Sequence, residues 1–191
     1  MQGGHLTDGK TSDRFLFDDC VIVELDEANI PEGQVFAGWT KTGSDKIISY
    51  NKTYSFLVRE STTVTAVYAE SDVTAVPAVV MYEHSFYMDV EAGSFNCERN
   101  VPDGYTYTGS GILVTGNEIT GESTDAFVIG ANYVDSHKAN GSALNANFSV
   151  VYTDVTKKLY GRAYLTYKNT ADEEITIYSD IEIYDPYSEL N

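Results

Sequence analysis

Residues 162–167 read Arg162-Ala163-Tyr164-Leu165-Thr166-Tyr167, and every second position of this stretch carries an apolar or aromatic side chain. Successive side chains of a β-strand point to opposite faces, so this period of two predicts a half-buried strand with Ala163, Leu165 and Tyr167 on one face. The same alternation recurs in residues 145–152. The isoleucines of residues 175–183 are likewise expected to share one face of a strand.

Strand patterns continue toward the N-terminus. Clusters of Gly, Asn, Asp and Pro separate them and favour turns, because Gly accepts positive φ and Pro fixes φ. No segment has a long helical period, and only residues 25–30 suggest a short helix or turn. We expect hairpin turns at residues 154–157 and 169–173, joining the last three strands. The other strand-like segments are residues 21–25, 54–58, 64–68, 78–84, 86–90, 94–99 and 126–133, with a Gly-rich segment at 105–121.

The pattern changes at residues 69–77. One strand ends at Tyr68, and a new series begins after Pro77 with seven or eight short strands, which predict an antiparallel β-sandwich. We therefore predict an all-β fold: a small β domain at residues 1–70, a β-sandwich at residues 77–184 and a C-terminal tail at residues 185–191. The connection has no Gly/Ser run, which predicts only moderate flexibility.

Three motifs occur in a fixed order in the first third of the chain: Val35-Phe36-Ala37-Gly38-Trp39-Thr40, Tyr54-Ser55-Phe56 and Thr62-Thr63-Val64-Thr65-Ala66-Val67-Tyr68. Together they resemble the divergent internalin-type B-repeats, which recur in surface proteins of Gram-positive bacteria. The resemblance implies a small β-grasp-like unit without an active site. The remainder, from Val101-Pro102-Asp103-Gly104-Tyr105-Thr106 to Ile177-Tyr178-Ser179-Asp180, resembles an Ig-like β-sandwich module of clostridial-type surface proteins.

The charge balance argues against two classes of partner. The chain has 12 Lys and Arg residues against 29 Asp and Glu residues, a formal charge of -17. Such a charge repels phosphate backbones and anionic lipid surfaces, so we expect no nucleic acid as a partner and no membrane insertion by this segment. No apolar run is long enough for a membrane span, and no signal peptide is recognisable. If the parent protein is exported, its signal and anchor are expected outside this segment.

Aromatic residues are the candidates for sugar binding, because the apolar face of a sugar stacks on a ring. The candidates are Trp39 and four tyrosines of the last strands, Tyr160, Tyr164, Tyr167 and Tyr178. The competing interpretation is structural, with Trp39 as a core anchor and the tyrosines covering the sheet faces. We favour the structural interpretation.

Motifs for metal binding are weak. The histidines His5, His84 and His137 are scattered. Cys20 and Cys97 have no CxxC spacing and lie on opposite sides of the domain boundary, so we interpret both as buried hydrophobes without a mutual disulfide. The acidic turns offer oxygen ligands for Ca²⁺ but lack EF-hand spacing, so solvated turns are expected, with adventitious calcium as the alternative. These turns are Asp18-Asp19, Asp172-Glu173-Glu174 and Asp135 with Asn140.

Three classes of function compete. The chain has no GxSxG nucleophile motif and no phosphate-binding loop, which disfavours an enzyme. We expect a non-catalytic structural or interaction module, without a cofactor, of a secreted or cell-surface bacterial protein, serving as a stalk, spacer or adhesion unit. The alternative is a carbohydrate-binding module. The expected partner is a host or plant glycan or a protein ligand, and the chain should act as a monomer within a larger multidomain protein.

Overall fold

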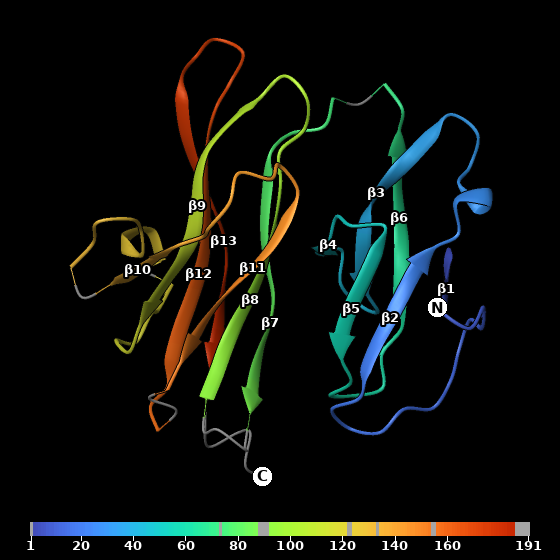
Figure 1. The fold of residues 1–191 in the computed structure, drawn as a ribbon, viewed down its shortest axis with the longest axis horizontal. Coiled ribbons are helices and arrows are strands. Elements are labelled where there is room, and N and C mark those ends of the chain that lie inside the picture. The colour runs from blue at the N-terminus through green and yellow to red at the C-terminus, as the bar shows by residue number, and fades with distance from the viewer. Residues whose placement is uncertain are drawn as a thin grey trace. The chain divides into compact units, whose positions relative to one another are not determined.

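A computed structural model describes residues 2–72, 74–87, 92–121, 124–132, 134–153 and 156–185. Among these residues the fold is all-β: short 3₁₀ turns are the only helices, and the strands form four antiparallel sheets. The chain divides into two compact units, Met1–Ala75 and Val76–Asn191 (Figure 1). The division falls inside residues 69–77, where the sequence pattern changes.

The first unit contains two three-stranded sheets, ordered β1-β2-β5 and β4-β3-β6. A parallel bridge between Gln2 and Thr65 connects the two sheets. The Gln2 amide donates to the carbonyl oxygen of Val64 over 3.1 Å, and the Ala66 amide donates to the carbonyl oxygen of Gln2 over 2.9 Å. The strands are β1 (Gly4–Leu6), β2 (Cys20–Leu25), β3 (Gln34–Lys41), β4 (Ile47–Ser49), β5 (Thr53–Leu57) and β6 (Val64–Glu70).

Alternation along the strands builds the core of the first unit. Val21 and Val23 of β2 are buried, and their neighbours along the strand are more exposed. Tyr54 and Phe56 repeat this arrangement on β5. The segment predicted as a short helix or turn contains a 3₁₀ turn at Glu27–Asn29.

Gly38 allows β3 to bulge next to the single tryptophan. The register between β3 and β6 shifts between Phe36 and Gly38, and Gly38 has φ +146°, which L residues rarely adopt. A Cβ at this position would lie 2.6 Å from the side chain of Ile47. The glycine of the Phe36-Ala37-Gly38-Trp39 motif is therefore needed both for the backbone conformation and for the packing.

The second unit is a β-sandwich. One sheet has the order β10-β9-β12-β13 and the other β11-β8-β7, and β13 lies beside β7 where the two sheets meet (Figure 1). The strands are β7 (Ala78–Tyr87), β8 (Ala92–Asn100), β9 (Thr106–Thr115), β10 (Asp135–Lys138), β11 (Ala146–Tyr152), β12 (Leu159–Lys168) and β13 (Glu174–Tyr184).

An apolar core fills the space between the two sheets. Ala163, Leu165 and Tyr167 belong to it, which confirms the predicted buried face of β12. They meet Phe95 and Cys97, which project from β8 in the opposite sheet. The other buried members are Val79, Met81, Val101, Ile112, Val114, Val150, Leu159 and Tyr184.

The isoleucines of β13 do not share one face, so that prediction is wrong. The pairing of β13 with β12 shifts near the middle of the strand, where β13 carries one extra residue. An extra residue reverses the faces beyond it. Ile175 and Ile177 pack against the core between the sheets, whereas Ile181 packs on the outer face and Ile183 is exposed.

Two other predictions are wrong. Residues 154–157 do not close a hairpin, because β11 pairs with β8 in one sheet while β12 pairs with β9 and β13 in the other. Residues 126–132 contain no strand, and a 3₁₀ turn at Thr124–Ala126 precedes a series of turns. The predicted hairpin turn at 169–173 does join β12 to β13. Residues 88–90, 133, 154–155 and 186–191, which belong to predicted strands, a turn and the tail, lie outside the described residues.

Candidate functional site

Trp39 is a core residue of the first unit. Its exposed fraction is 0%, and its ring Nε1 donates a hydrogen bond to the carbonyl oxygen of Asn51 over 2.9 Å. The ring of Phe36 meets it edge-on, with 5.4 Å between the ring centroids. Gly4 also packs against the indole, since a Cβ on Gly4 would lie 2.5 Å from the ring. The tryptophan therefore has no ring face open to a sugar.

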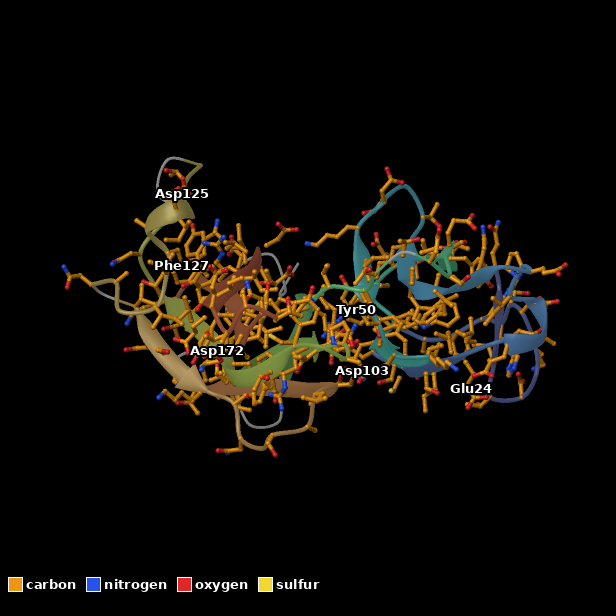
Figure 2. The ribbon with its side chains drawn as sticks, turned by 90° about the horizontal axis from the view of Figure 1, so that it is seen from above. Glu24, Tyr50, Asp103, Asp125, Phe127 and Asp172 are labelled. Carbon is orange, nitrogen blue, oxygen red and sulfur yellow. The ribbon has the colours of Figure 1, made fainter. Side chains whose placement is uncertain are left out.

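The tyrosines on the outer face of β12 are covered. Tyr160 and Tyr164 pack with Leu113 and Phe127 in a second, smaller core, which lies under the segment that connects β9 to β10. Figure 2 shows Asp125 at the outer end of this segment and Phe127 nearer the sheet. Tyr160 and Tyr164 share the outer face of β12, as alternation along a strand requires. In a simple two-layer sandwich this face would be exposed to solvent, but here the segment between β9 and β10 buries it.

Arg162 fastens the covering segment to the sheet. Its guanidinium donates a hydrogen bond to the carbonyl oxygen of Phe127 over 3.1 Å and lies 4.8 Å from the ring centroid of Tyr178. The hydroxyl of Tyr178 accepts a hydrogen bond from the Ile129 amide over 3.3 Å. Tyr167 lies on the opposite face, in the main core. The four tyrosines are packed against protein and do not form a sugar-stacking strip.

Arg99 is a buried cation inside the sandwich. Its guanidinium donates to Ser110 Oγ over 2.8 Å and to the carbonyl oxygen of Ala143 over 3.0 Å. It also lies 4.5 Å from the ring centroid of Tyr107. Hydrogen bonds and the ring offset the cost of burying this charge, so the arrangement is structural. It holds β8, β9 and the segment before β11 together.

The histidines do not converge on a metal. His5 Nδ1 lies 2.9 Å from the carbonyl oxygen of Leu6 and 3.9 Å from the Glu24 carboxylate. His137 is exposed on β10, in the other unit, and the side chain of His84 lies outside the described residues. In the part of the chain that the structure describes, no group of three His, Cys, Asp or Glu side chains is placed to hold a metal ion.

The two cysteines are free and lie in different units. The expected lack of a mutual disulfide is confirmed. Cys97 is buried as expected, but Cys20 is exposed at the start of β2, so the prediction of a second buried cysteine is wrong. Burial raises the pKa of the Cys97 thiol well above its ordinary value, and the negative charge of Glu182 raises it further. Cys97 is therefore an inert thiol rather than a nucleophile.

The acidic turns have protein partners. Asp19 accepts the backbone amide of Leu16 over 2.7 Å, and Asp18 pairs with Arg59 over 2.8 Å. Asp18 also has φ 68°, a conformation that Asp tolerates in tight turns. Both carboxylates of this turn therefore have partners within the protein.

The other two acidic candidates are the turn at residues 172–174 and the pair of Asp135 and Asn140. Asp172, with φ 63°, accepts a hydrogen bond from Lys168 Nζ over 2.9 Å. Asp135 begins β10, and Asn140 follows its end, so an extended strand separates these two residues. The structure does not bring them together as ligands of one ion.

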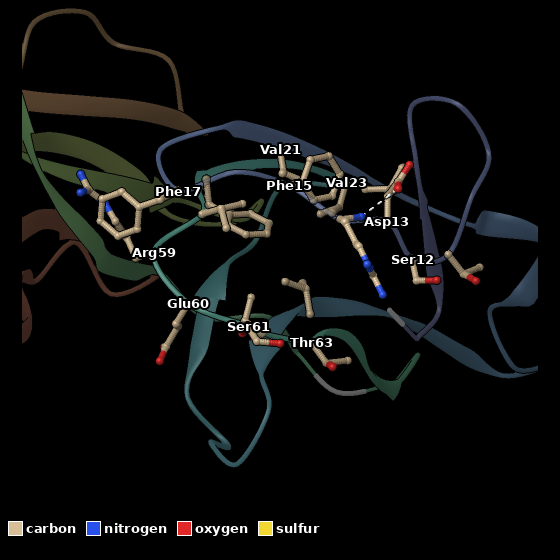
Figure 3. A pocket seen from close by; sticks show the side chains of 17 residues that line it. Ser12, Asp13, Phe15, Phe17, Val21, Val23, Arg59, Glu60, Ser61 and Thr63 are labelled. Carbon is tan, nitrogen blue, oxygen red and sulfur yellow. Dashed lines mark hydrogen bonds between the residues drawn. The ribbon is translucent and has the colours of Figure 1, made fainter.

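The first unit holds a pocket of about 640 Å³ (Figure 3). Its floor is part of the hydrophobic core: Leu6, Val21, Val23, Phe56 and Val64. The segment that leads into β2 forms one wall, and residues 58–63, after β5, form the opposite wall. The pocket therefore reaches from the surface to the core of this unit.

The wall before β2 is an irregular segment with exposed apolar side chains. Phe15 and Phe17 line the pocket, while Leu16 between them is 76% exposed. Backbone hydrogen bonds anchor the end of this segment to Val58: the Asp18 amide donates to the Val58 carbonyl over 2.8 Å, and the Val58 amide donates to the Asp19 carbonyl over 3.0 Å.

Sequence reasoning missed this pocket, although a signal was present. Phe15-Leu16-Phe17 is a run of three apolar residues outside any strand alternation, with Asp13 before it and Asp18 after it. A short apolar run between charged turn residues is unusual for a solvated loop. Such a run indicates a segment that packs over another surface or presents one.

No helix among the described residues is long and apolar enough to cross a lipid bilayer. No known protein family, curated protein or solved structure matches this chain. The likeness to internalin-type B-repeats and to the clostridial-type module therefore rests on the sequence motifs alone.

Proposed function

We propose that this chain is a non-catalytic structural and interaction module of a secreted or cell-surface bacterial protein, in which it serves as a spacer or stalk unit. The observation that carries the proposal is the path of the chain through the second unit. The first strand, β7, and the last strand, β13, run in the same direction (Figure 1). The chain therefore enters the sandwich at one end and leaves it at the other.

The strand pairing fixes these directions. Ala78 at the start of β7 pairs with Asn100 at the end of β8, and a short connection leads from there to Thr106 at the start of β9. Lys168 pairs with both Thr106 and Glu174, so β9 and β13 begin at the same end of the sandwich. Since β7 has 10 residues, the two ends lie about 30 Å apart. A sandwich connected in this way adds its length to a multidomain chain.

The placement of reactive side chains supports a non-catalytic role. Cys97 is shielded in the core, and the guanidinium groups of Arg99 and Arg162 bind backbone carbonyls. His5 and His137 lie in separate units. Export and the surface location are supported by the motif resemblance and by an acidic composition that suits a soluble extracellular module.

The carbohydrate-binding alternative has less support. The aromatic residues that the sequence offered for stacking, Trp39, Tyr160 and Tyr164, are all buried. A sugar site of the stacking type needs exposed ring faces with hydrogen-bonding side chains beside them. The spacer proposal uses the same aromatic residues as packing.

Mechanical unfolding of single molecules tests the spacer proposal. Pulling on the two ends of the second unit draws β7 and β13 in opposite directions along their own axes, so many ladder hydrogen bonds must break together. As a control, the same protein is pulled through handles at Lys157 and Asp185. These sites flank the paired residues Leu159 and Tyr184, so the β12–β13 ladder opens one pair at a time.

We expect a clearly higher unfolding force for the end-to-end geometry than for the control. Equal unfolding forces in the two geometries would contradict the proposed spacer or stalk function. Specific binding of the chain to an array of host and plant glycans would favour the carbohydrate-binding alternative instead.

A further inference from the structure

We propose that the pocket of the first unit binds a small organic carboxylate, with the apolar body of the ligand in the cavity and its carboxylate on Arg14. The site is a feature of the first unit alone and does not depend on the spacer function, which rests on the second. Three properties of the pocket lead to this ligand class: its size, its apolar floor and its charge.

The size suits an organic molecule rather than an ion. A cavity of about 640 Å³ falls within the usual range for small-molecule sites, roughly 300–1,000 Å³. Its floor consists of the aliphatic and aromatic side chains of Leu6, Val21, Val23, Phe56 and Val64. An alkyl or ring group bound there would be transferred from water to an apolar surface, and the gain in free energy is proportional to the apolar area buried.

The floor also disfavours a sugar. A sugar carries hydroxyl groups around its ring, and each hydroxyl that enters the cavity must find a hydrogen-bond partner or lose free energy. The polar side chains of the pocket belong to the two walls and include Ser12, Ser61 and Thr63. The fitting ligand therefore has one polar end, near these hydroxyls, and one apolar end.

Arg14 supplies the charge. The chain has four arginines; Arg99 and Arg162 bind carbonyl oxygens inside the second unit, and Arg59 pairs with Asp18 at one end of the pocket. Arg14 is one of the residues that line the pocket, and its guanidinium has no hydrogen-bond or ion-pair partner among the described residues. In a chain with an excess of acidic residues, an arginine without a carboxylate next to an apolar cavity is a site for an external carboxylate.

The acidic residues of the pocket do not neutralise Arg14. Asp13 pairs with Lys10 over 2.7 Å and accepts the backbone amide of Arg14 over 2.8 Å. Hydrogen bonding to Lys10 lowers the pKa of Asp13, so this carboxylate is committed. Glu60 extends away from the space enclosed by Phe15, Ser12 and Thr63 (Figure 3). The hydroxyl groups of Ser12, Ser61 and Thr63 can donate further hydrogen bonds to the carboxylate of the ligand.

Calorimetric titration of the full 191-residue chain with octanoate, at low salt and below its micelle concentration, tests the site. Hexanoate and octanamide are the comparison ligands. We expect affinity to rise about fourfold for each added methylene that the cavity buries. Octanamide has the same chain without the charge, so it should bind at least about tenfold more weakly than octanoate. Added salt should weaken octanoate binding.

Matched variants locate the site. Arg14→Gln should lower the affinity for octanoate at least about tenfold, and Arg14→Lys should retain part of the binding. Lys138→Gln removes an equal charge from exposed β10 in the other unit and should change nothing. Glu60→Gln should leave the affinity equal or higher. No binding of any carboxylate, equal binding of octanamide, or an unchanged affinity in Arg14→Gln would overturn the proposal, while the pulling experiment on the second unit would keep its meaning.

Discussion

The two sheets of the sandwich pack closely at Gly161, and replacing this glycine with alanine is a sharp test of the core. Gly161 lies on β12 and faces the ring of Phe95 on β8. A Cβ at position 161 would lie 2.8 Å from the Cγ and Cδ1 atoms of that ring. Ordinary carbon contacts are about 3.5–4.0 Å. The methyl group therefore needs most of an ångström that the core does not offer.

The neighbours of Phe95 decide the size of the effect. Its exposed fraction is 0%, and the ring of Tyr152 packs against it with 5.3 Å between the centroids. Because the ring cannot move into solvent, we expect Gly161→Ala to cost about 1–3 kcal/mol of unfolding free energy, the usual range for overpacking. For a unit of this size that corresponds to a melting temperature lower by about 4–12 °C.

Gly109→Ala is the matched control. Gly109 lies on β9 of the same sandwich, and nothing lies within 4 Å of a Cβ built there. Because alanine also restricts the unfolded chain, this variant should be neutral or stabilising by up to about 1 kcal/mol. Circular dichroism in a urea titration would follow both units, while the fluorescence of Trp39 reports on the first unit alone.

The two variants are expected to differ in the urea concentration at which the second unit unfolds. Gly161→Ala should shift the transition of the second unit and leave the Trp39 transition in place. If Gly161→Ala unfolds at the same urea concentration as Gly109→Ala, the close contact between β12 and Phe95 is not a feature of the protein in solution.

Three further predictions concern single side chains. Trp39→Ala should destabilise the first unit by roughly 3–5 kcal/mol, and wild-type Trp39 should emit at short wavelength with little quenching by iodide; an emission maximum typical of exposed tryptophan would contradict its burial. A water-soluble thiol reagent should modify Cys20 at once but Cys97 only after denaturation, which mass spectrometry of the labelled peptides would show. Hydrogen bonding to Lys10 lowers the pKa of Asp13, so the stabilisation from this pair is present above pH about 4 and is lost as the pH falls through the lowered pKa. When stability is titrated with acid, Asp13→Asn should remove this pH dependence, and an unchanged titration curve would rule out the pair.

The alternation in residues 162–167 predicted the faces of β12 correctly. Ala163, Leu165 and Tyr167 do line the main core, because side-chain direction in a regular strand depends on the local backbone alone. The all-β character followed from the same periodicity, repeated along the chain. Local patterns therefore determine most of the strands in this protein.

Pairing between distant strands was harder to predict. The extra residue in β13 shifts its pairing with β12 and reverses the faces of the positions beyond it, so that Ile177 packs inside and Ile181 packs outside. Likewise, the turn residues between β11 and β12 look like those of a hairpin, although the strands belong to different sheets. Turn chemistry shows that the chain changes direction, but the partner of the next strand depends on the packing of the whole unit.

The exposure of some side chains also depends on loops that have no regular sequence pattern. Tyr160 and Tyr164 occupy the outer face of β12, as alternation requires, yet Phe127 and its segment cover them. Phe15 and Phe17 lie in an irregular segment, where no periodic signal marks a wall of a pocket. A loop that packs on a sheet is stabilised by contacts far away in the sequence, so its neighbours cannot be read from its own residues.

The two units differ in net charge, and this difference bears on where an anionic ligand would bind. Residues 1–70 carry 11 acidic and six basic residues, whereas the rest of the chain carries 18 acidic and six basic residues. The strongly negative field of the second unit favours its buried Arg99 and its partly buried Arg162, and it repels a free anion. The first unit is less negative, and there Arg14 keeps its guanidinium free beside an apolar cavity. An anionic ligand would therefore meet the least repulsion in the unit that also offers a cation and an apolar floor.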